Sequence, residues 1–291
     1  MTAIAPSEMP AAARRGVDRR LVGRVAGNLA LTLLAGVYLL PLVWLLSISV
    51  RVQSDVFRSL LIPGSFDPAN YPRAWDKFGL DILFLNSVLV TVGTVAIGVT
   101  LSVAAAYGFA RYRSRWTEVV YVLILVGLMV PPAAIIIPFF LGMLTLGLYD
   151  SLVAVIVGET SFVLAFGILV FRGYIDHIPH ELLDAARVDG ATEWTTFRRI
   201  VVPLLRPPLA TVSIFFAIST WNGFLLPLVL IRNTDRATLT VGLSRYTGQF
   251  GTQDWNLLAA AAVMAIVPLL VVFIAARRSY VRGLSAGAIK S

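Results

Sequence analysis

The chain has 291 residues, of which 58% are hydrophobic and only 14% are charged, and its mean hydropathy is +0.82. Soluble domains carry roughly 25% charged residues, so this composition excludes an ordinary soluble protein and indicates an integral membrane protein. The net charge of +8 does not indicate nucleic-acid binding, because the basic residues are spread over short loops between apolar runs. Cysteine is absent, which excludes disulfides, iron–sulfur sites and thiol chemistry.

Six apolar runs are each long enough to cross a bilayer, which takes about 20 residues in a helix. They cover residues 25–50, 83–110, 119–141, 152–171, 209–231 and 257–276. The predicted fold class is therefore an all-α polytopic membrane protein with six transmembrane helices. We expect no cleaved signal peptide, because the first run is longer than a signal-peptide core and no small-residue cleavage site follows it.

The basic residues predict the orientation. Of the 24 Lys and Arg residues, 17 lie in the two termini and in the second and fourth connections, which share one side of the membrane. Since positive residues gather on the cytoplasmic side, both termini and the polar loop are predicted to face the cytoplasm. The predicted parts are an N-terminal tail (1–24), a six-helix domain (25–281) with a polar cytoplasmic loop (174–206), and a C-terminal tail (282–291).

Two of the apolar runs contain helix breakers. Pro131, Pro132 and Pro138 are expected to interrupt the third run, and Asn222, Gly223 and Pro227 the fifth. Broken helices are tolerated in a membrane only where neighbouring protein or a water-filled cavity satisfies the freed backbone groups. Each proline alone is most simply an ordinary kink. Together they predict a packed bundle with a translocation path.

The segment from Pro179 to Pro203 is polar and cannot lie in hydrocarbon, because unpaired charges are costly there. Pro179 suits the first turn of a helix, and Glu181 complements the helix dipole at that end. Gly190 lies where a helix normally stops, and Thr192 can cap a second short helix that Pro203 ends. The pattern predicts a helix–turn–helix pair that could seat in a groove of a cytosolic partner.

At these residues the chain resembles the permease subunits of binding-protein-dependent ABC importers. The cytoplasmic loop of that family carries Glu-Ala-Ala, three residues, Gly, nine residues, and then Ile-x-Leu-Pro. The matching positions here are Asp184, Ala185, Ala186, Gly190, Ile200, Val202 and Pro203. Asp184 replaces the Glu and Val202 replaces the Leu, and both departures keep charge or apolarity.

Further matches narrow the resemblance to the carbohydrate-uptake branch, similar to the MalG-type subunit of maltose importers. They include Asn86-Ser87, Ala105-Ala106-Tyr107, Phe109-Ala110-Arg111, Pro138, Phe166-Gly167, Trp221-Asn222 and residues 283–290. Gly223 departs from the acidic residue usual after Trp-Asn.

The resemblance implies a type I ABC importer permease fold and an importer that takes up a sugar or oligosaccharide. Its implied partners are a second permease, expected to form a heterodimer with this chain, ATPase subunits that bind ATP and Mg, and an extracytoplasmic solute-binding protein. This chain itself would hold no cofactor. The loop from Glu181 to Pro203 would couple to the ATPase, and the C-terminal tail would also reach it. The last outer loop would face the binding protein through Tyr246, Gly248, Gln249 and Phe250.

The chain has no G-x-x-x-x-G-K-[ST] phosphate loop, so we expect it not to be an enzyme. Glu159, inside the fourth run, motivates an alternative function as an ion- or proton-coupled carrier, because intramembrane acids are functional candidates. Glu159 could instead bond sugar hydroxyls on the path, or be a structural partner of Thr160, Ser161 or a neighbouring helix. Trp221 and Asn222 are the other path candidates.

Two smaller patterns receive structural interpretations. His177 and His180 have an H-x-x-H spacing without a third ligand nearby, so no metal site is expected. Glu118 and Arg115, at the start of the third run, are expected to form an interfacial ion pair.

Overall fold

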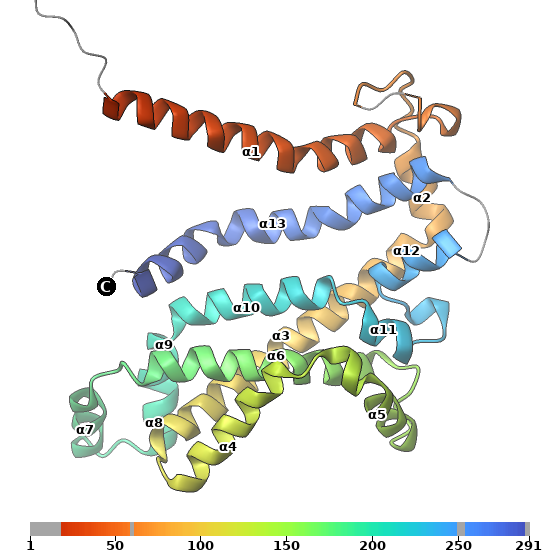
Figure 1. Ribbon diagram of the computed structural model, residues 1–291. Helices are drawn as coiled ribbons and strands as arrows, with labels where there is room; N and C mark the ends of the chain where they lie inside the picture. The colour runs from red at the N-terminus through yellow and green to blue at the C-terminus, as the bar shows by residue number, and fades with distance from the viewer. Residues whose placement is uncertain (1–18, 59–60, 249–253, 289–291) are drawn as a thin grey trace, which may run out of the picture.

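The computed structural model describes residues 19–58, 61–248 and 254–288, and this part of the chain is helical with no strand (Figure 1). The helices are α1 (Arg19–Ser49), α2 (Asn70–Phe78), α3 (Leu80–Arg111), α4 (Arg115–Val126), α5 (Pro132–Thr145), α6 (Leu152–Ile175), α7 (His180–Val188), α8 (Glu193–Thr196), α9 (Val202–Leu204), α10 (Arg206–Trp221), α11 (Leu225–Leu230), α12 (Leu239–Gly248) and α13 (Trp255–Ala288). Short helical turns complete the list: η1 (Gln53–Asp55), η2 (Gly127–Met129), the π-helical η3 (Phe197–Val201) and η4 (Thr234–Arg236).

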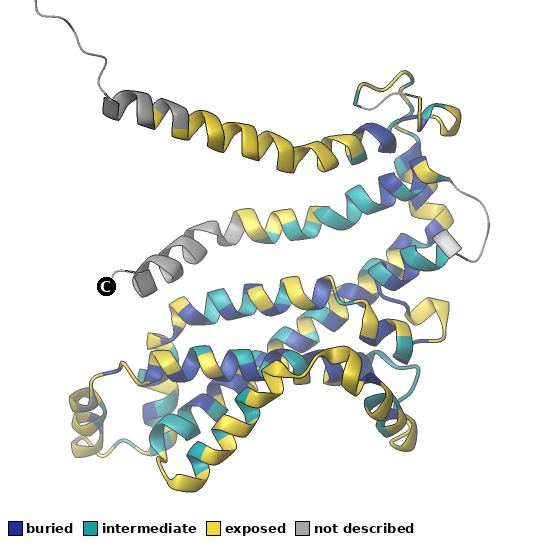
Figure 2. Ribbon diagram, in the orientation of Figure 1, coloured by how far each residue is buried: buried dark blue, intermediate teal, exposed yellow. Residues whose placement is uncertain are grey.

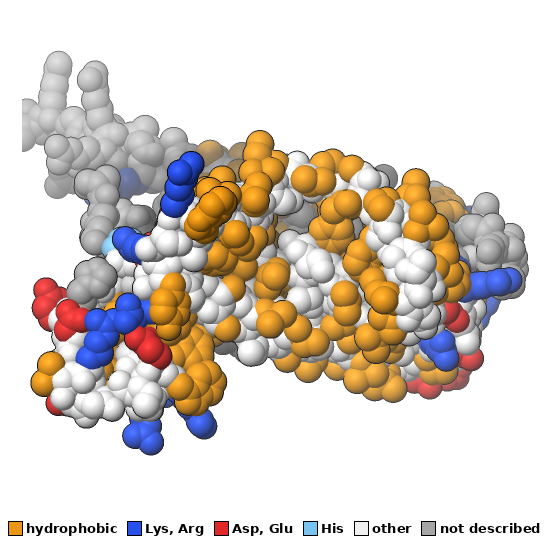
Figure 3. Space-filling view, turned by 90° about the horizontal axis from the view of Figure 1, so that it is seen from below, with side chains coloured by type: hydrophobic (Ala, Val, Ile, Leu, Met, Phe, Trp, Pro, Cys, Tyr) orange, Lys and Arg blue, Asp and Glu red, His pale blue; other side chains and the backbone are white. Residues whose placement is uncertain are grey.

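Four described helices, α1, α3, α6 and α13, are long and apolar enough to cross a membrane. Two bent helix pairs raise the number to six if each pair is one span. The predicted all-α polytopic architecture is therefore confirmed. Figure 3 agrees with a membrane setting, because hydrophobic side chains cover the middle of the visible face while Lys, Arg, Asp and Glu lie toward its ends.

The first bent pair consists of α4 with η2 and of α5, which meet at 108°. Pro131 lies at the break and Pro132 opens α5, where a missing backbone N–H costs nothing. The prediction that Pro138 interrupts a helix was wrong, because α5 continues through it. Packing of the buried Ile136 and Met143 on either side of Pro138 holds the helix together despite the missing hydrogen bond.

The fifth predicted run is broken where expected. α10 ends at Trp221 and α11 begins at Leu225, so residues 222–224 are non-helical. Pro227 lies in the first turn of α11, where it is tolerated.

The second bent pair turns by 75° just before α10. The prediction that Pro203 ends the loop's second helix was wrong, because α9 runs through Pro203 and the chain turns at Leu205 instead. Pro207 and Pro208 follow that turn in the first turn of α10, where the first backbone N–H groups have no partner within the helix.

The core of the bundle lies where α3, α6 and α10 pack together, through Val103, Phe171 and Phe216 (Figure 2). The helices approach closely because small residues face each other at the crossing. A Cβ built on Gly167 would lie 2.3 Å from Ser102 Oγ. Such close contacts are how membrane helices associate without a hydrophobic driving force.

α1 is exposed along most of its length and is attached to the bundle at its C-terminal end (Figure 2). There the fully buried Asn70 donates to the carbonyl oxygens of Ser49 and Arg51 and accepts from Asn256 Nδ2. Asn70 opens α2, a nine-residue helix that the sequence analysis did not predict.

The helix ends define two ends of the molecule. The start of α1, the end of α13 and the α7–α9 segment lie at one end, which we call the loop end (Figure 1). α2, α11 and α12 lie at the opposite end, which we call the outer end.

Candidate functional site

The helix–turn–helix pair predicted in the polar loop is present. α7 follows Pro179 and carries Glu181 in its first turn, and Thr192 Oγ1 caps α8 by accepting from Thr195 N–H. Gly190 joins the two helices with φ +75°. An L-residue with a Cβ pays about 1–2 kcal/mol for that conformation, so the bend selects glycine.

A four-bond contact fastens α8 to the end of α3. The Glu193 carboxylate accepts from Tyr107 Oη at 2.7 Å, from Arg111 Nη2 at 2.6 Å, and from Arg111 Nε at 3.0 and 3.2 Å. We call these three residues the loop lock. A guanidinium that bonds both oxygens of a carboxylate is among the stronger and more directional polar contacts, so the loop lock fixes the position of α8 relative to the end of α3.

A second set of charges joins the loop ends of α4 and α6. The buried Arg172 donates to Glu118 Oε1 and lies 3.9 Å over the Tyr121 ring, while Arg113 Nη2 donates to Asp176 Oδ1 at 2.7 Å. The predicted pairing of Glu118 with Arg115 was wrong. α4 packs against α6, which brings Arg172 to Glu118.

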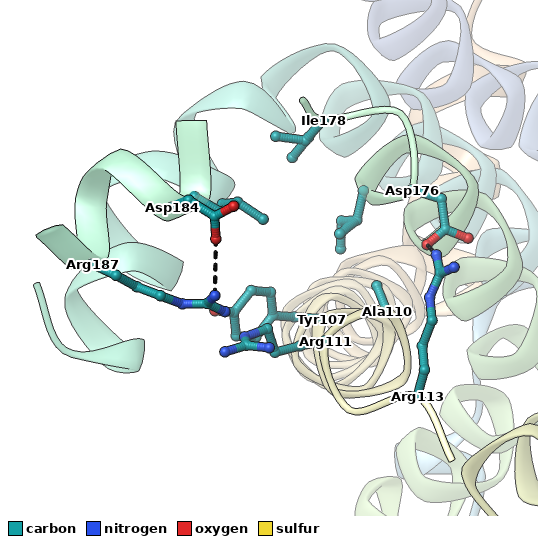
Figure 4. Close-up of a pocket in the computed structure, with 10 residues that line it drawn as sticks. Tyr107, Ala110, Arg111, Arg113, Asp176, Ile178, Asp184 and Arg187 are labelled. Carbon is teal, nitrogen blue, oxygen red and sulfur yellow. Dashed lines mark hydrogen bonds and ion pairs between the residues drawn. The ribbon is translucent and has the colours of Figure 1, made fainter. Parts of the chain in front are cut away.

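Between α7 and the bundle lies a cavity of about 310 Å³ (Figure 4). Its polar lining comes from α3, from α7 and from the residues just after α3 and α6: Tyr107, Arg111, Arg113, Asp176, Asp184 and Arg187. Arg187 is held by Asp184 at 2.9 Å on α7 itself. Arg187 Nη2 also lies 3.9 Å from Glu193 Oε1 of α8. α7 therefore contacts the bundle through the buried Ala186 and borders the cavity, while α8 is hydrogen-bonded to α3.

The predicted coupling residues divide by exposure. Ala186 is buried toward the bundle and Ile200 is half-buried. The others are exposed: Glu181, Asp184, Ala185, Gly190 and Pro203. Apolar side chains beside them are also exposed, with Val188 at 89% and Trp194 at 66%. The loop thus presents an unpartnered surface at the loop end.

Glu159 lies on α6 with 7% exposure and faces the break between α10 and α11. A Cβ built on Gly223 would lie 2.6 Å from Glu159 Oε1, so the carboxylate occupies the space that a side chain at position 223 would need. This gives a physical reason for the glycine after Trp-Asn. Ser161 Oγ donates to Val157 O and Thr160 Oγ1 has no partner in the described structure, so neither residue holds Glu159.

The other two path candidates differ from each other. Trp221 is buried and its Nε1 donates to Ala265 O of α13 at 3.2 Å, so its indole packs the bundle. Asn222 is exposed, and its Nδ2 donates to Ile218 O at 2.8 Å. The structure therefore brings Glu159 to the break that Asn222 borders, whereas Trp221 holds α10 against α13.

The segment that follows α11 is fixed at the outer end by contacts the sequence analysis did not find. Asn86 Nδ2 donates to the carbonyl oxygens of Asp235 and Ala237, and Ser87 Oγ accepts from Leu239 N–H. Thr240 Oγ1 donates to Gly223 O at 2.6 Å. In the sequence, the Asn86-Ser87 pair supported the resemblance to the family but did not predict these contacts.

Asp150 clamps the same segment and should make its stability depend on pH. Its carboxylate accepts from the backbone N–H groups of Asn233 and Arg232, which hold the pKa of Asp150 below its usual value of 3.8. The stabilisation is therefore complete above pH 3.8 and is lost as the pH falls through the lowered pKa.

Asp150→Asn should remove this acid-dependent part of the unfolding free energy without backbone strain, since Asn tolerates the φ of +58°. Thermal unfolding between pH 7 and 2 measures it, with Asp189→Asn as the control that should keep the dependence.

The predicted binding-protein-facing loop is only partly described. Tyr246 packs on Phe78 with ring centroids 4.6 Å apart, and Gly248 ends α12, while Gln249 and Phe250 lie outside the described residues. No group of three or more His, Cys, Asp or Glu that could hold a metal occurs in the part of the chain that was described.

Residues 98–285 match the family described as the binding-protein-dependent transport system inner membrane component. The chain belongs to this family. The match covers the loop lock, the bend at Gly190 and the break that Glu159 faces, so the features built up above are those of a transport permease.

Named relatives resemble the permease over most of its length. It is 34% identical to the probable ABC transporter permease protein YurM of Bacillus subtilis, over 86% of this chain and 83% of that one. It is 30% identical to the diacetylchitobiose uptake system permease protein NgcG of Streptomyces coelicolor, over 94% and 90%. A solved bacterial ABC transporter involved in import of the acidic polysaccharide alginate matches with a TM-score of 0.80 and 27% identity, over 93% of this chain and 99% of that one.

Proposed function

We propose that this permease is the membrane-spanning subunit of an ABC importer for a sugar or oligosaccharide. An extracytoplasmic binding protein delivers the solute, and separate ATPase subunits, which bind ATP and Mg, supply the energy. The chain sits in the bacterial plasma membrane with both termini and the loop end in the cytoplasm. It performs no catalysis itself.

The observation that carries this proposal is the α7–α8 pair, bent at Gly190 and fastened to α3 by the loop lock. An exposed helix that stands over a cavity, next to a helix rigidly joined to the bundle, suits the transfer of a partner's movement to the membrane helices. The exposed apolar Val188 and Trp194 supply contact area for an ATPase.

The printed names of relatives support a carbohydrate solute, since they include diacetylchitobiose, arabinooligosaccharide and maltodextrin permeases. The solute path would run past Glu159 and Asn222 at the break, with Trp221 positioning α10.

The exposure of α1 supports a second permease subunit. None of the residues in its most apolar stretch is buried within this chain. A helix of mean hydropathy 2.3 can face lipid, but a partner permease would also cover it, and the resemblance favours a heterodimer.

The energy source is the deciding test. The purified permease alone should hydrolyse no ATP. When the permease is co-expressed with its ATPase subunits and the complex is reconstituted in proteoliposomes, ATP hydrolysis should appear and should rise severalfold with solute-loaded binding protein. Hydrolysis should continue when a protonophore collapses the proton gradient. The alternative, a proton-coupled carrier using Glu159, requires uptake that stops with the protonophore and persists without ATP.

A further inference from the structure

The break between α10 and α11 brings two oxygen acceptors to one point inside the bundle. The position that a Cβ of Gly223 would take lies 2.6 Å from Glu159 Oε1 and 2.9 Å from the carbonyl oxygen of Thr220. We call these two oxygens the acceptor pair. The Thr220 carbonyl oxygen already accepts from Gly223 N–H at 3.0 Å and has a second lone pair. An ionised carboxylate and a carbonyl can only accept hydrogen bonds, so a group that approaches both oxygens must donate.

No basic side chain of the described residues forms an ion pair with Glu159. Its carboxylate takes part in no hydrogen bond or ion pair among the described residues. Arg172, the basic residue of α6, lies near the far end of that helix and is engaged by Glu118 and Asp176. Buried polar groups are normally satisfied within the protein, and an isolated buried charge is costly. A partner from outside the chain would remove that cost.

The backbone adds to the negative character of this point. α10 ends at Trp221, and the C-terminal end of a helix carries the negative end of its dipole. The carbonyl oxygen of Thr220 belongs to that end. Carboxylate and helix end therefore repel anions and attract donors or cations.

The acceptor pair also lies beside an exposed position. Asn222 is exposed and directly precedes Gly223, and residues 222–224 are unwound within the fifth run. Unwound backbone at membrane depth occurs where protein or a water-filled cavity covers it. A solute moving along Asn222 would pass the acceptor pair.

We propose that Glu159 selects the solute by charge, admitting neutral or amino-bearing carbohydrates and disfavouring acidic ones. This inference rests on the proposed function, because it concerns the same path. Hydroxyl and ammonium groups of a sugar donate to the acceptor pair, whereas the carboxylate of an acidic sugar brings only further negative charge. The permease would then differ in solute charge from the alginate importer that it resembles.

The absence of cysteine makes a direct test possible. In Asn222→Cys, the new thiol is the only one in the chain. The complete transporter in membrane vesicles is treated at pH 8 with two methanethiosulfonates of similar size, one bearing a trimethylammonium group and one a sulfonate. Mass spectrometry of this chain gives the rate of labelling by each. The cationic reagent should react faster.

Adding Glu159→Gln should lower the cationic-to-anionic rate ratio about tenfold, because a unit charge a few ångströms away contributes on the order of 1 kcal/mol or more. Glu159→Asp keeps the charge and should keep most of the ratio. Glu181→Gln makes the same charge change on the exposed loop, where the ratio should not move.

The outcomes separate the two proposals. Labelling of Asn222→Cys with a ratio that Glu159→Gln leaves unchanged would overturn charge selection while leaving the transport function in place. If neither reagent reached Asn222→Cys, the path itself would be contradicted.

Discussion

Replacing Gly190 by Trp is expected to reduce uptake at least tenfold while the permease remains in the membrane. Gly190 has φ +75°, which costs an L-residue about 1–2 kcal/mol. Apart from the two chain neighbours, no atom of the described residues lies within 4 Å of a Cβ built there. The new side chain therefore starts in open space and projects from the bend that we propose to dock on the ATPase. Uptake and the amount of ATPase that co-purifies with the permease measure the effect.

Gly190→Asn is the matched control, because Asn tolerates the left-handed conformation better than other residues and is much smaller than Trp. It should retain most of the uptake. Normal transport by the Trp variant with ATPase bound would contradict the docking role. Equal losses in both variants would show that the backbone conformation, rather than the surface, limits transport.

The bend was predictable because its signals are local. A helix stop at Gly190 and a cap at Thr192 follow from residues within a few positions of each other, and the structure has both. The four continuous spans, α1, α3, α6 and α13, were predictable for a similar reason, since hydropathy is summed over a short window.

Predictions from neighbouring residues were wrong at positions where contacts with other helices determine the structure. Pro138 and Pro203 were both expected to interrupt or end helices, yet helices continue through them. Pro138 lies inside α5 between the buried Ile136 and Met143, whereas Pro203 lies in the first turn of α9, where a missing backbone N–H costs little. The expected pair of Glu118 with Arg115 failed likewise, because α6 supplies a better-placed partner in Arg172.

The loop lock could not have been derived from spacing. Glu193 and Arg111 are separated by 82 positions in the chain, and nothing in either neighbourhood specifies the other. The resemblance pointed to Arg111 at the end of the second run without giving it a role. The contacts of Asp150 could not have been derived from spacing either, since its partners Arg232 and Asn233 lie 82 and 83 positions away in the chain.

Glu159 shows the complementary case, in which sequence analysis found the residue and the structure changed its interpretation. The neighbours Thr160 and Ser161 were candidate partners, but side chains one or two positions along a helix point to different faces. The carboxylate instead meets Gly223, 64 positions further on, where the missing side chain makes room for it. The glycine at position 223, where the family usually has an acidic residue, therefore makes room for the carboxylate of Glu159.

That pairing predicts a large effect of Gly223→Ala. The new Cβ would lie 2.6 Å from Glu159 Oε1 and 2.9 Å from the Thr220 carbonyl oxygen, both closer than atoms of these types approach. The end of the Glu159 side chain can move aside in part, but the Thr220 backbone oxygen cannot. Overpacking of this kind costs about 1–3 kcal/mol, so the purified permease should unfold at a lower temperature and transport poorly. Gly108→Ala, at a position where a Cβ would meet nothing within 4 Å, should be harmless.

A double-mutant cycle distinguishes crowding from charge. Glu159→Ala removes the atoms that the new Cβ meets, so it should restore part of the unfolding free energy lost in Gly223→Ala; the Thr220 carbonyl oxygen remains at 2.9 Å and limits the rescue. Glu159→Gln keeps the same shape without the charge and should restore nothing. If Gln rescued as well as Ala, the tension at this point would be electrostatic, and the account of Gly223 as the residue that makes space for Glu159 would fail.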